Sequence, residues 1–468
     1  MSTSMPSSTL DIKESTSTSP TIIYWFRHDL RLNDHPALTQ VCQQANRLLF
    51  VYCHPTYRQE ITRWNIPRTS QHRQQFLAST LADLSTQLRL ANSELLQIEG
   101  NPADVLPALA QETNAISIYC EEIAAPEEQA EVNALRATGL MVHTVWLSSM
   151  LDPANLPFEV NALPDVFTHF RHLVERHHTQ PPPPLPIPKN IPPLPESYAA
   201  IAKKWSKAPE ITSSQSACNA EQMSHQIADS IRISIDDRSS FPHFLPEFSG
   251  GASAASKHLQ QYFFRQLAST YKLTRNDLTG RDYSTKFSPW LASGALSART
   301  AYAALKEYEN VYGANDSTYW IWFELLWRDY FRLLHLKYGR QLYSSRGLTN
   351  SPEPMHDTHR FDAWCQAKTG ESLVDAGMTE LAATGYLSNR LRQIGASYLI
   401  HDLGCDWRAG AAWFESQLID YDVYSNQGNW LYLSGRGTDP RNGRRFDPQK
   451  QAHEHDRDGT YQRLWGTL

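Results

Sequence analysis

Five short apolar runs, each separated from the next by a helical pattern, occupy the first third of the chain. The runs are TIIYWF, LLFVYC, LLQIEG, AISIYC and MVHTVW, and helical periodicity covers residues 33–45, 70–90, 102–111 and 126–137 between them. Strands that alternate with helices in this way form a parallel sheet with helices on its faces. The pattern predicts an α/β domain over residues 21–150, Rossmann-like, with a parallel five-stranded sheet. It contains no GxGxxG turn, so the usual dinucleotide fingerprint is absent.

Proline dominates the next part of the chain. Pro181 to Pro184 are followed by prolines at 186, 188, 192, 193 and 195. Repeated prolines disfavour helices and central strands, so residues 151–248 are predicted to form a semi-extended connector that wraps over the first domain. Residues 1–20 are rich in Ser and Thr without an apolar segment, which predicts a disordered tail.

The pattern becomes helical and aromatic after residue 249. Helical segments are predicted at 256–272, 298–312, 318–338 and 371–384, and nine tryptophans lie between positions 290 and 465. Residues 249–468 are therefore predicted to form a large all-α domain. Most of its tryptophans are expected in the core, because indole rings bury a large apolar area.

Composition narrows the class of protein. Apolar residues make up 41% and charged residues 20% of 468 positions, with a net charge of −6, so the chain is not a wholly basic nucleic-acid coat, although a local basic patch is compatible with these values. The six cysteines show neither CxxC nor His-pair spacing, which indicates a reducing, cytoplasmic setting and no metal site. No apolar stretch approaches the roughly 18 residues that a membrane span needs.

The segment LIDYDVYSNQGNW, residues 418–430, concentrates chemical groups. It contains Asp420, Asp422, Asn426 and Trp430. On a helix, residues four apart share a face, so the amide of Asn426 and the indole of Trp430 are expected side by side.

Several motifs together resemble the photolyase and cryptochrome family, and its DASH branch most of all. They are GYLSNRLR at 385–392, FELLWRDYF at 323–331, LPDVFTHFR at 163–171 and SNQGNW at 425–430. The resemblance extends from about Thr21 to Leu468. It implies that the helical domain binds FAD and DNA.

The opening motif WFRHDLRLND, residues 25–34, is also similar to a family signature. Its four charged residues Arg27, Asp29, Arg31 and Asp34 have a simpler interpretation, in which they neutralise one another at a domain interface. We favour this structural role.

The cofactor residues follow from the resemblance. The Ser/Thr-rich turn before Pro289 is, from its residues alone, more typical of a helix cap, but as the family's flavin-phosphate loop it would bind a diphosphate. Arg392 is expected to pair with Asp420 beside the flavin ring, and Asn426 is expected to face the flavin N5 atom. The full predicted set is Tyr271, Ser284, Thr285, Lys286, Phe287, Ser288, Arg328, Asn389, Arg392, Asp420, Asp422 and Asn426.

The substrate residues are also implied by the resemblance. Glu324 and Trp327 would contact the damaged bases, because an indole stacks on a base and a carboxylate accepts a hydrogen bond from its edge. The alternative is that Trp327 is core and Glu324 pairs with Arg328. Double-strand photolyases carry a tryptophan where this chain has Tyr432, which favours single-stranded substrates. Arg436, Arg441 and Arg444 lie in a Gly-rich loop that either contacts phosphates or is a solvated basic loop.

Two further features of the family match incompletely. Photoreduction in the family runs along three tryptophans; Trp430 and Trp407 match the first two, but Pro354 occupies the expected distal position. Tyr343, Trp364 and Trp413 are alternative exits for the electron hole, or else ordinary packing residues. An antenna, 5,10-methenyltetrahydrofolate, is expected from the DASH branch, with Glu122 as its carboxylate; alternatively, Glu122 is only a charge at a strand exit.

The sequence therefore supports one main hypothesis and two alternatives. The main hypothesis is a deoxyribodipyrimidine photo-lyase that uses FAD and blue or near-UV light to reverse cyclobutane pyrimidine dimers, chiefly in single-stranded DNA, with Glu324, Asn426, Trp430 and Trp407 as its catalytic residues. It would act as a monomer, with RNA and duplex loops as further candidate partners. The alternatives are a blue-light photoreceptor that signals through its flavin redox state, with nucleic-acid binding secondary, and a structural nucleic-acid binder with an inactive flavin.

Overall fold

The N-terminal part of the chain forms a parallel α/β domain. A computed structural model describes residues 20–205, 236–441 and 443–466; the predicted tail, 1–20, lies almost wholly outside them. The strands are β1 (Thr21–Phe26), β2 (Arg47–His54), β3 (Leu95–Glu99), β4 (Ala115–Glu121) and β5 (Val142–Val145). They form one parallel sheet of order β3-β2-β1-β4-β5, with β1 in register with β2 from Thr21–Arg47 to Phe26–Tyr52. The predicted five-stranded sheet is confirmed.

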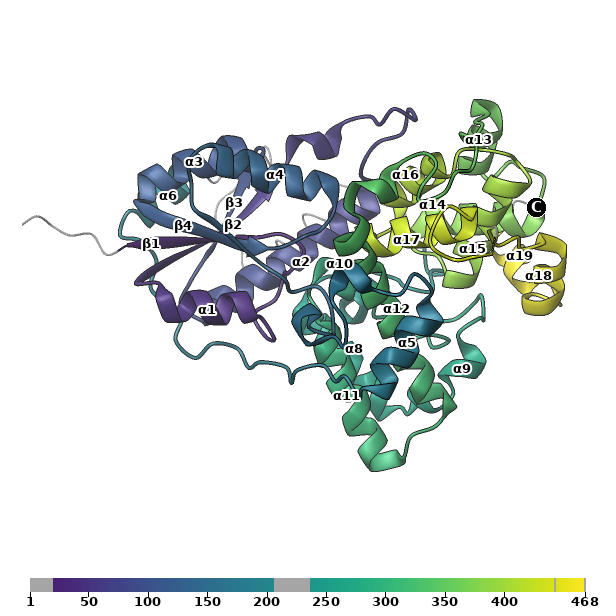
Figure 1. Ribbon diagram of the computed structural model, residues 1–468, viewed down its shortest axis with the longest axis horizontal. Coiled ribbons are helices and arrows are strands. Elements are labelled where there is room, and N and C mark those ends of the chain that lie inside the picture. Colours follow the sequence, from purple (N-terminus) through teal and green to yellow (C-terminus); the bar gives the residue numbers. More distant parts are fainter. Residues whose placement is uncertain (1–19, 206–235, 442, 467–468) are drawn as a thin grey trace, which may run out of the picture.

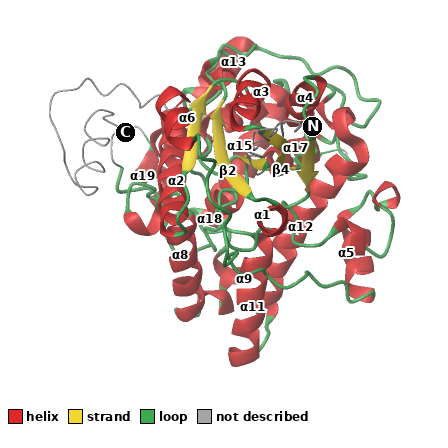
Figure 2. Ribbon diagram, turned by 90° about the vertical axis from the view of Figure 1, so that its left-hand side faces the viewer, coloured by secondary structure: helices red, strands yellow, loops and turns green. Residues whose placement is uncertain are grey.

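Helices cover both faces of this sheet. Helices α1 (Pro36–Gln44) and α2 (Gln71–Leu90) pack on one face, and α3 (Pro102–Thr113) and α4 (Pro126–Ala137) pack on the other (Figure 1). Strand β1 is buried along its whole length, which explains why its sequence is continuously apolar rather than alternating. Figure 2 shows the strands enclosed between the helices.

The connector runs along the first domain and then packs against the second. Backbone amides of Asp34 and Leu48 donate to the carbonyls of Leu185 and Pro193, so the proline-rich part follows the α/β domain as predicted. In the part of the connector that the structure describes, two α-helices interrupt it, α5 (Phe167–Arg176) and α6 (Tyr198–Trp205). The expectation that this region lacks helices was therefore wrong. The prolines cluster at 181–195, so they do not prevent these two segments from forming helices.

The described residues of the C-terminal part form helices and loops but no β-strand. Its longest helix, α12 (Asp316–Tyr338), begins with a capping box formed by Asn315 and Thr318. The α-helices are α8 (Ala252–Phe264), α9 (Tyr271–Thr274), α10 (Ser288–Ser293), α11 (Ala298–Tyr312), α12, α13 (Thr358–Cys365), α14 (Ser372–Thr384), α15 (Asn389–His401), α16 (Trp407–Gln417), α17 (Val423–Ser434), α18 (Pro448–His455) and α19 (Thr460–Trp465). None of the described helices is long and apolar enough to cross a membrane.

One predicted helix, 256–272, is too long. Helix α8 ends at Phe264, and Gln266 adopts a left-handed conformation with φ of 56° before the chain turns into α9. No glycine or proline marks this break in the sequence. The early end of α8 separates Tyr271 from it and places this tyrosine at the wall of the cavity described below.

The charged residues of the opening motif do not neutralise one another. Arg27 pairs with Glu131 at 2.8 Å, whereas Asp29 accepts hydrogen bonds from Tyr24 and His35. Asp34 pairs with Arg299 of the helical domain at 2.7 Å, and Arg31 donates to the Gly294 carbonyl at 2.9 Å. The motif therefore does lie at the domain interface, but Arg27 and Asp34 form their ion pairs with residues of other segments, Glu131 and Arg299.

Candidate functional site

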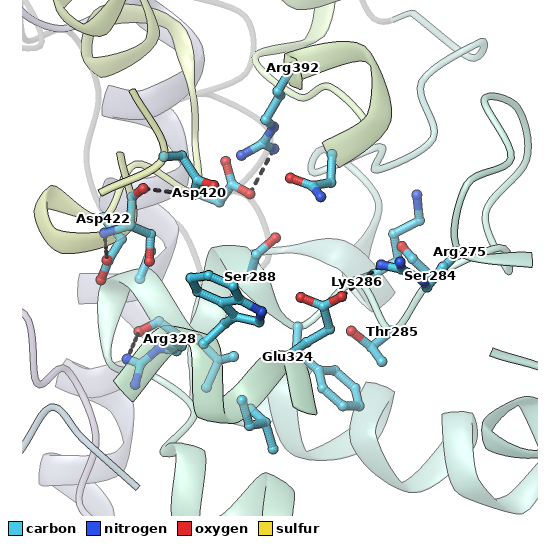
Figure 3. Close-up of a pocket in the computed structure, with 18 of the residues that line it drawn as sticks. Arg275, Ser284, Thr285, Lys286, Ser288, Glu324, Arg328, Arg392, Asp420 and Asp422 are labelled. Atoms are coloured by element: carbon cyan, nitrogen blue, oxygen red, sulfur yellow. Dashed lines mark hydrogen bonds and ion pairs between the residues drawn. The ribbon is translucent and has the colours of Figure 1, made fainter. Parts of the chain in front are cut away.

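A cavity of about 420 Å³ opens in the helical domain. It is enclosed by the loop before α10, by α12, by the start of α15 and by the segment that leads into α17. Figure 3 shows side chains from these elements pointing toward the same space. All but one of the predicted cofactor residues line it: Tyr271, Ser284, Thr285, Lys286, Phe287, Ser288, Arg328, Asn389, Arg392, Asp420 and Asp422.

Asn426 lies in an adjoining cavity. This smaller space, about 70 Å³, shares Asn389, Arg392 and Asp420 with the main cavity and is also lined by Trp430. The Asn426 amide donates to the Ala411 carbonyl at 3.1 Å, which anchors it to α16. On α17 the amide and the indole thus share a cavity, as their spacing predicts.

Lys286 is a buried lysine in the wall of the cavity. Its side chain is 1% exposed, and among the described residues its Nζ has no hydrogen-bond partner. The ammonium lies 3.4 Å from the centre of the Tyr283 ring and 4.9 Å from that of Tyr386. Burial lowers the pKa of Lys286 well below its usual value. A buried donor of this kind fits an anionic ligand such as a diphosphate.

The backbone around Lys286 supports the same conclusion. Lys286 has a φ of 57°, in the left-handed region that residues other than glycine seldom adopt. Such strain costs about 1–3 kcal/mol and occurs mainly at ligand-binding sites. Here it turns the lysine inward between Thr285 and Phe287, which also line the cavity.

Two acidic residues and two arginines form one wall. Arg392 donates to Asp420 at 2.8 Å, as predicted, while Asp420 Oδ1 is buried and has no partner among the described residues (Figure 3). Asp422 pairs with Arg332 and caps α17 by accepting from the Ser425 amide at 2.7 Å. Burial alone would raise the pKa of Asp422, but Arg332 and Arg328 hold it well below its usual range. This wall carries charges of both signs.

Glu324 projects into the cavity from α12. It accepts a hydrogen bond from Arg275 at 2.7 Å, so the alternative pairing with Arg328 is wrong (Figure 3). Arg328 instead donates to the carbonyls of Ser148 and Leu291. Burial raises the pKa of Glu324, although Arg275 opposes this shift. Sequence reasoning missed Arg275, because an isolated arginine next to a short helix gives no recognisable signal.

Trp327 is held from behind by the connector. Its ring stacks on Phe167 of α5 with centroids 3.7 Å apart and planes at 11°, while Tyr432 meets it edge-on at 6.0 Å. Both Trp327 and Tyr432 line the cavity. Phe167 was not predicted as a site residue, although it lies within the LPDVFTHFR motif, because nothing in that motif indicated which helix it would meet.

The three arginines of the Gly-rich loop lie outside the lining of this cavity. Arg444 places its guanidinium 5.3 Å from the Tyr432 ring, Arg436 donates to the Pro352 carbonyl, and exposed Arg441 pairs with Asp439 at 3.2 Å. Arg444 is thus next to the proposed substrate wall. The other two lie farther along the same loop.

The two tryptophans expected to carry electrons are both buried. Trp430 packs so tightly against α16 that a Cβ atom added at Gly410 would lie 2.2 Å from its ring. Trp407 donates its indole N–H to the Ser345 carbonyl at 3.0 Å. Both belong to one hydrophobic core.

A second cleft of about 350 Å³ lies between the two domains. Trp407, Asn426 and Tyr421 contribute from the helical domain, and Arg58 and Glu128 contribute from the α/β domain. Glu122 is not among its lining residues. The carboxylates that do line it are Glu127, Glu128 and Glu415.

Comparisons with known proteins agree with this geometry. Residues 320–466 match the family model described as the FAD binding domain of DNA photolyase, and residues 22–189 match the model described as DNA photolyase. The chain is 40% identical to the cryptochrome DASH of Gloeobacter violaceus (95% of this chain, 85% of the relative) and 40% identical to that of Xenopus laevis (96% and 82%). The crystal structure of a cryptochrome from Synechocystis sp. PCC6803 superimposes with a TM-score of 0.84 at 38% identity, covering 96% of this chain and 89% of the other. The chain carries an FAD binding domain and belongs to the photolyase and cryptochrome family, in its cryptochrome DASH branch.

Proposed function

We propose that this protein is a light-driven, FAD-dependent lyase that splits cyclobutane pyrimidine dimers, chiefly in single-stranded DNA. One observation carries the proposal: a single cavity joins a carboxylate and an indole to a buried lysine that has no hydrogen-bond partner within the described parts of the chain. The lysine suits the diphosphate of a dinucleotide cofactor. Glu324 and Trp327 suit a pyrimidine pair turned out of the strand.

The residues present fit FAD. Ser284, Thr285 and Ser288 offer hydroxyl groups near the Lys286 ammonium, which is the donor set that a diphosphate requires. At the other end, Arg392 places a cation beside the adjoining cavity that Asn426 lines, where the flavin ring would lie. Reduced FAD, when bound, supplies the electron that light transfers to the dimer. The side chains orient the two ligands and exclude water.

Glu324 and Trp327 have separate tasks toward the substrate. The Glu324 carboxyl is held by Arg275, and its raised pKa makes the protonated form more accessible, so it can donate to a pyrimidine carbonyl or accept from an imide N–H. Trp327 offers a ring for stacking, and its contact with Phe167 fixes the orientation of that ring. These groups position the dimer next to the flavin.

We also propose that a methenyltetrahydrofolate antenna occupies the interdomain cleft. The cleft brings several arginines and carboxylates together beside the flavin domain, and a polar, aromatic pterin could use both kinds of group. Glu127 and Glu128 are better placed than Glu122 to bind it. Absorption spectra of the purified protein before and after removal of small molecules would test this assignment.

The repair proposal is tested with a cyclobutane thymine dimer in matched single-stranded and duplex oligonucleotides. The holoprotein is reduced chemically beforehand, so that the route of photoreduction does not affect the result. We expect light-dependent repair of the single strand and much less repair of the duplex. The variant Glu324→Gln should retain FAD but repair more slowly, while Glu307→Gln, an exposed site on α11, serves as the matched control. Absence of repair in either substrate with FAD bound and reduced would refute the proposal and favour a photoreceptor.

A further inference from the structure

The electron path from the protein surface to the flavin is incomplete in this chain. Trp430 and Trp407 lie buried in one core, but Pro354 occupies the position of the expected distal tryptophan. Pro354 belongs to the segment 344–357 that joins Tyr343 to α13, and Trp407 donates its indole N–H to Ser345 of this same segment. A donor that replaces the distal tryptophan should therefore lie near Ser345.

Tyr343 lies at the start of this segment. It is the last residue of the short 3-10 helix Gly339–Tyr343, and it lines the interdomain cleft together with Trp407. The carbonyl of its neighbour Leu342 accepts a hydrogen bond at 2.6 Å from Gln427, which precedes Trp430 on α17. The chain around Tyr343 is thus bonded both to the Trp407 indole and to the helix that carries Trp430.

His335 provides Tyr343 with a proton acceptor. His335 Nδ1 lies 2.7 Å from the Phe331 carbonyl, which can only accept, so Nδ1 carries the hydrogen. In the neutral ring Nε2 then has a free lone pair, and it lies 3.1 Å from the Tyr343 hydroxyl. The phenol therefore donates to an imidazole whose tautomer is fixed by the backbone. Burial lowers the pKa of His335 to about 4, which keeps the ring neutral before the electron leaves.

We propose that Tyr343, with His335 as its proton acceptor, is the terminal electron donor that replaces the missing distal tryptophan. The proposal rests on the proposed flavin site, toward which Trp430 and Trp407 lead. It assigns a function to a pair that DNA repair itself does not use, a partly buried tyrosine and a buried histidine.

The transfer moves one electron and one proton away from Tyr343. Oxidised Trp407 takes one electron from the Tyr343 phenol, and the phenolic proton moves to His335 Nε2. Trp407 is restored, Tyr343 is a neutral phenoxyl radical and His335 is an imidazolium; the electron that Trp407 had passed inward would be held by FAD when it is bound. An external thiolate that enters the cleft then returns one electron to Tyr343, the proton returns from His335 to the phenolic oxygen, and two thiyl radicals combine as a disulfide. Loss of the proton prevents a positive charge from accumulating on the partly buried ring, where desolvation would disfavour it.

Other aromatic residues are less suited to this task. Trp364 is fully buried between Phe361 and Phe414. Trp413 does not line the cleft that Trp407 reaches. Trp64 does line it, but the Arg63 guanidinium lies 4.5 Å from its ring and opposes a positive charge there.

The test follows flavin photoreduction by absorbance under blue light, with thiol present, in the FAD-loaded protein. Tyr343→Phe should slow photoreduction about tenfold, which corresponds to about 1.4 kcal/mol in the barrier, and Tyr343→Trp should restore part of the rate. Trp413→Phe is the control and should leave the rate unchanged. The wild-type rate should fall in D₂O, because transfer of the phenolic proton accompanies transfer of the electron. That isotope effect should disappear in Tyr343→Phe, which has no such proton. A merely structural role of Tyr343 would not produce an isotope effect.

A second readout identifies the radical directly. Ring-deuterated tyrosine should narrow the electron paramagnetic resonance signal formed by a light flash, and Tyr343→Phe should remove that signal. An unchanged rate in Tyr343→Phe together with loss of photoreduction in Trp64→Phe would overturn the proposal. Dimer repair by the chemically reduced Tyr343→Phe variant should equal that of the wild type, so failure of this proposal remains distinguishable from failure of the repair proposal.

Discussion

Replacing Lys286 by methionine should make the protein without FAD more stable and make FAD bind more weakly. Lys286 is 1% exposed, and among the described residues its ammonium contacts only aromatic rings in place of a hydrogen-bond acceptor. Methionine has a similar length and no charge. Both residues have a Cβ atom, so the strain of the left-handed backbone at this position is the same in the two proteins.

The size of each effect follows from the partner of Lys286, which is absent in the apoprotein and is FAD in the holoprotein. A buried donor without a partner costs about 1–3 kcal/mol, and more when charged, so the apoprotein should gain at least about 1 kcal/mol. A hydrogen bond to a charged group contributes about 1.5–3 kcal/mol, so FAD affinity should fall about 10- to 150-fold. Lys286 therefore destabilises the protein without FAD and strengthens FAD binding.

Chemical unfolding of the apoprotein and FAD titration measure the two effects. The pKa of Lys286 is lowered in the folded state, so the unfolded state binds more protons between that lowered value and the usual pKa of about 10.4. Stability of the wild-type apoprotein should consequently rise with pH through this window, and Lys286→Met should lack this contribution. Lys272→Met, at a lysine that pairs with Asp316 on the surface, is the control and should change neither quantity much. An apoprotein of Lys286→Met that is less stable, or that binds FAD as tightly as before, would refute the reasoning.

Three further substitutions test other parts of the structure. Tyr432→Trp should raise duplex repair relative to single-strand repair, because base stacking on an aromatic ring contributes about 1–3 kcal/mol per base; an unchanged ratio would remove Tyr432 from the specificity argument. Gly410→Ala should destabilise the protein by about 1–3 kcal/mol and lower its melting temperature, since the new Cβ would meet the Trp430 ring at 2.2 Å; Gly377→Ala is the matched control and should not, because Gly377 also lies inside a helix without a positive φ and its nearest neighbours are 3.7 Å or more away. Burial raises the pKa of Glu380 to about 7, so its contribution to the free energy of unfolding should decline by up to about 3 kcal/mol as pH rises from about 4.5 to 7. Glu380→Gln should flatten that part of the pH profile of urea unfolding. An unaltered profile would count against the shift.

The sheet could be predicted from the sequence because its strands are buried on both faces. Continuous apolar runs such as Ile22 to Phe26 are typical of strands that are covered on both sides, and helices between them force a parallel arrangement. The connector was harder to predict. Its helix α5 is stabilised by long-range contacts, for example between Phe170 and Tyr330, rather than by a strong local signal.

The residues of the candidate site could be found from local motifs, but most of the contacts between them could not be predicted from the residues themselves. Arg392 and Asp420 are 28 residues apart and were paired by resemblance alone, whereas Arg275 with Glu324 and Phe167 with Trp327 depend on how distant segments dock. The tautomer of His335 likewise depends on a backbone carbonyl one turn earlier in α12. Sequence supplies the chemical groups, and tertiary packing decides which of them meet.

The connector also gives a physical reason for the proposed single-strand preference. Phe167 covers one face of Trp327, and Lys337 holds this part of the connector through the Leu163 carbonyl and Asp165. One face of the indole is therefore occupied by Phe167, and the opposite wall is Tyr432, which offers a smaller ring than a tryptophan would. Turning bases out of a duplex costs a few kcal/mol per nucleotide, while each stacked base gains about 1–3 kcal/mol. With one indole face and one phenol available, stacking can at best offset this cost for a duplex, whereas in a single strand the cost is largely absent and the same contacts produce net binding.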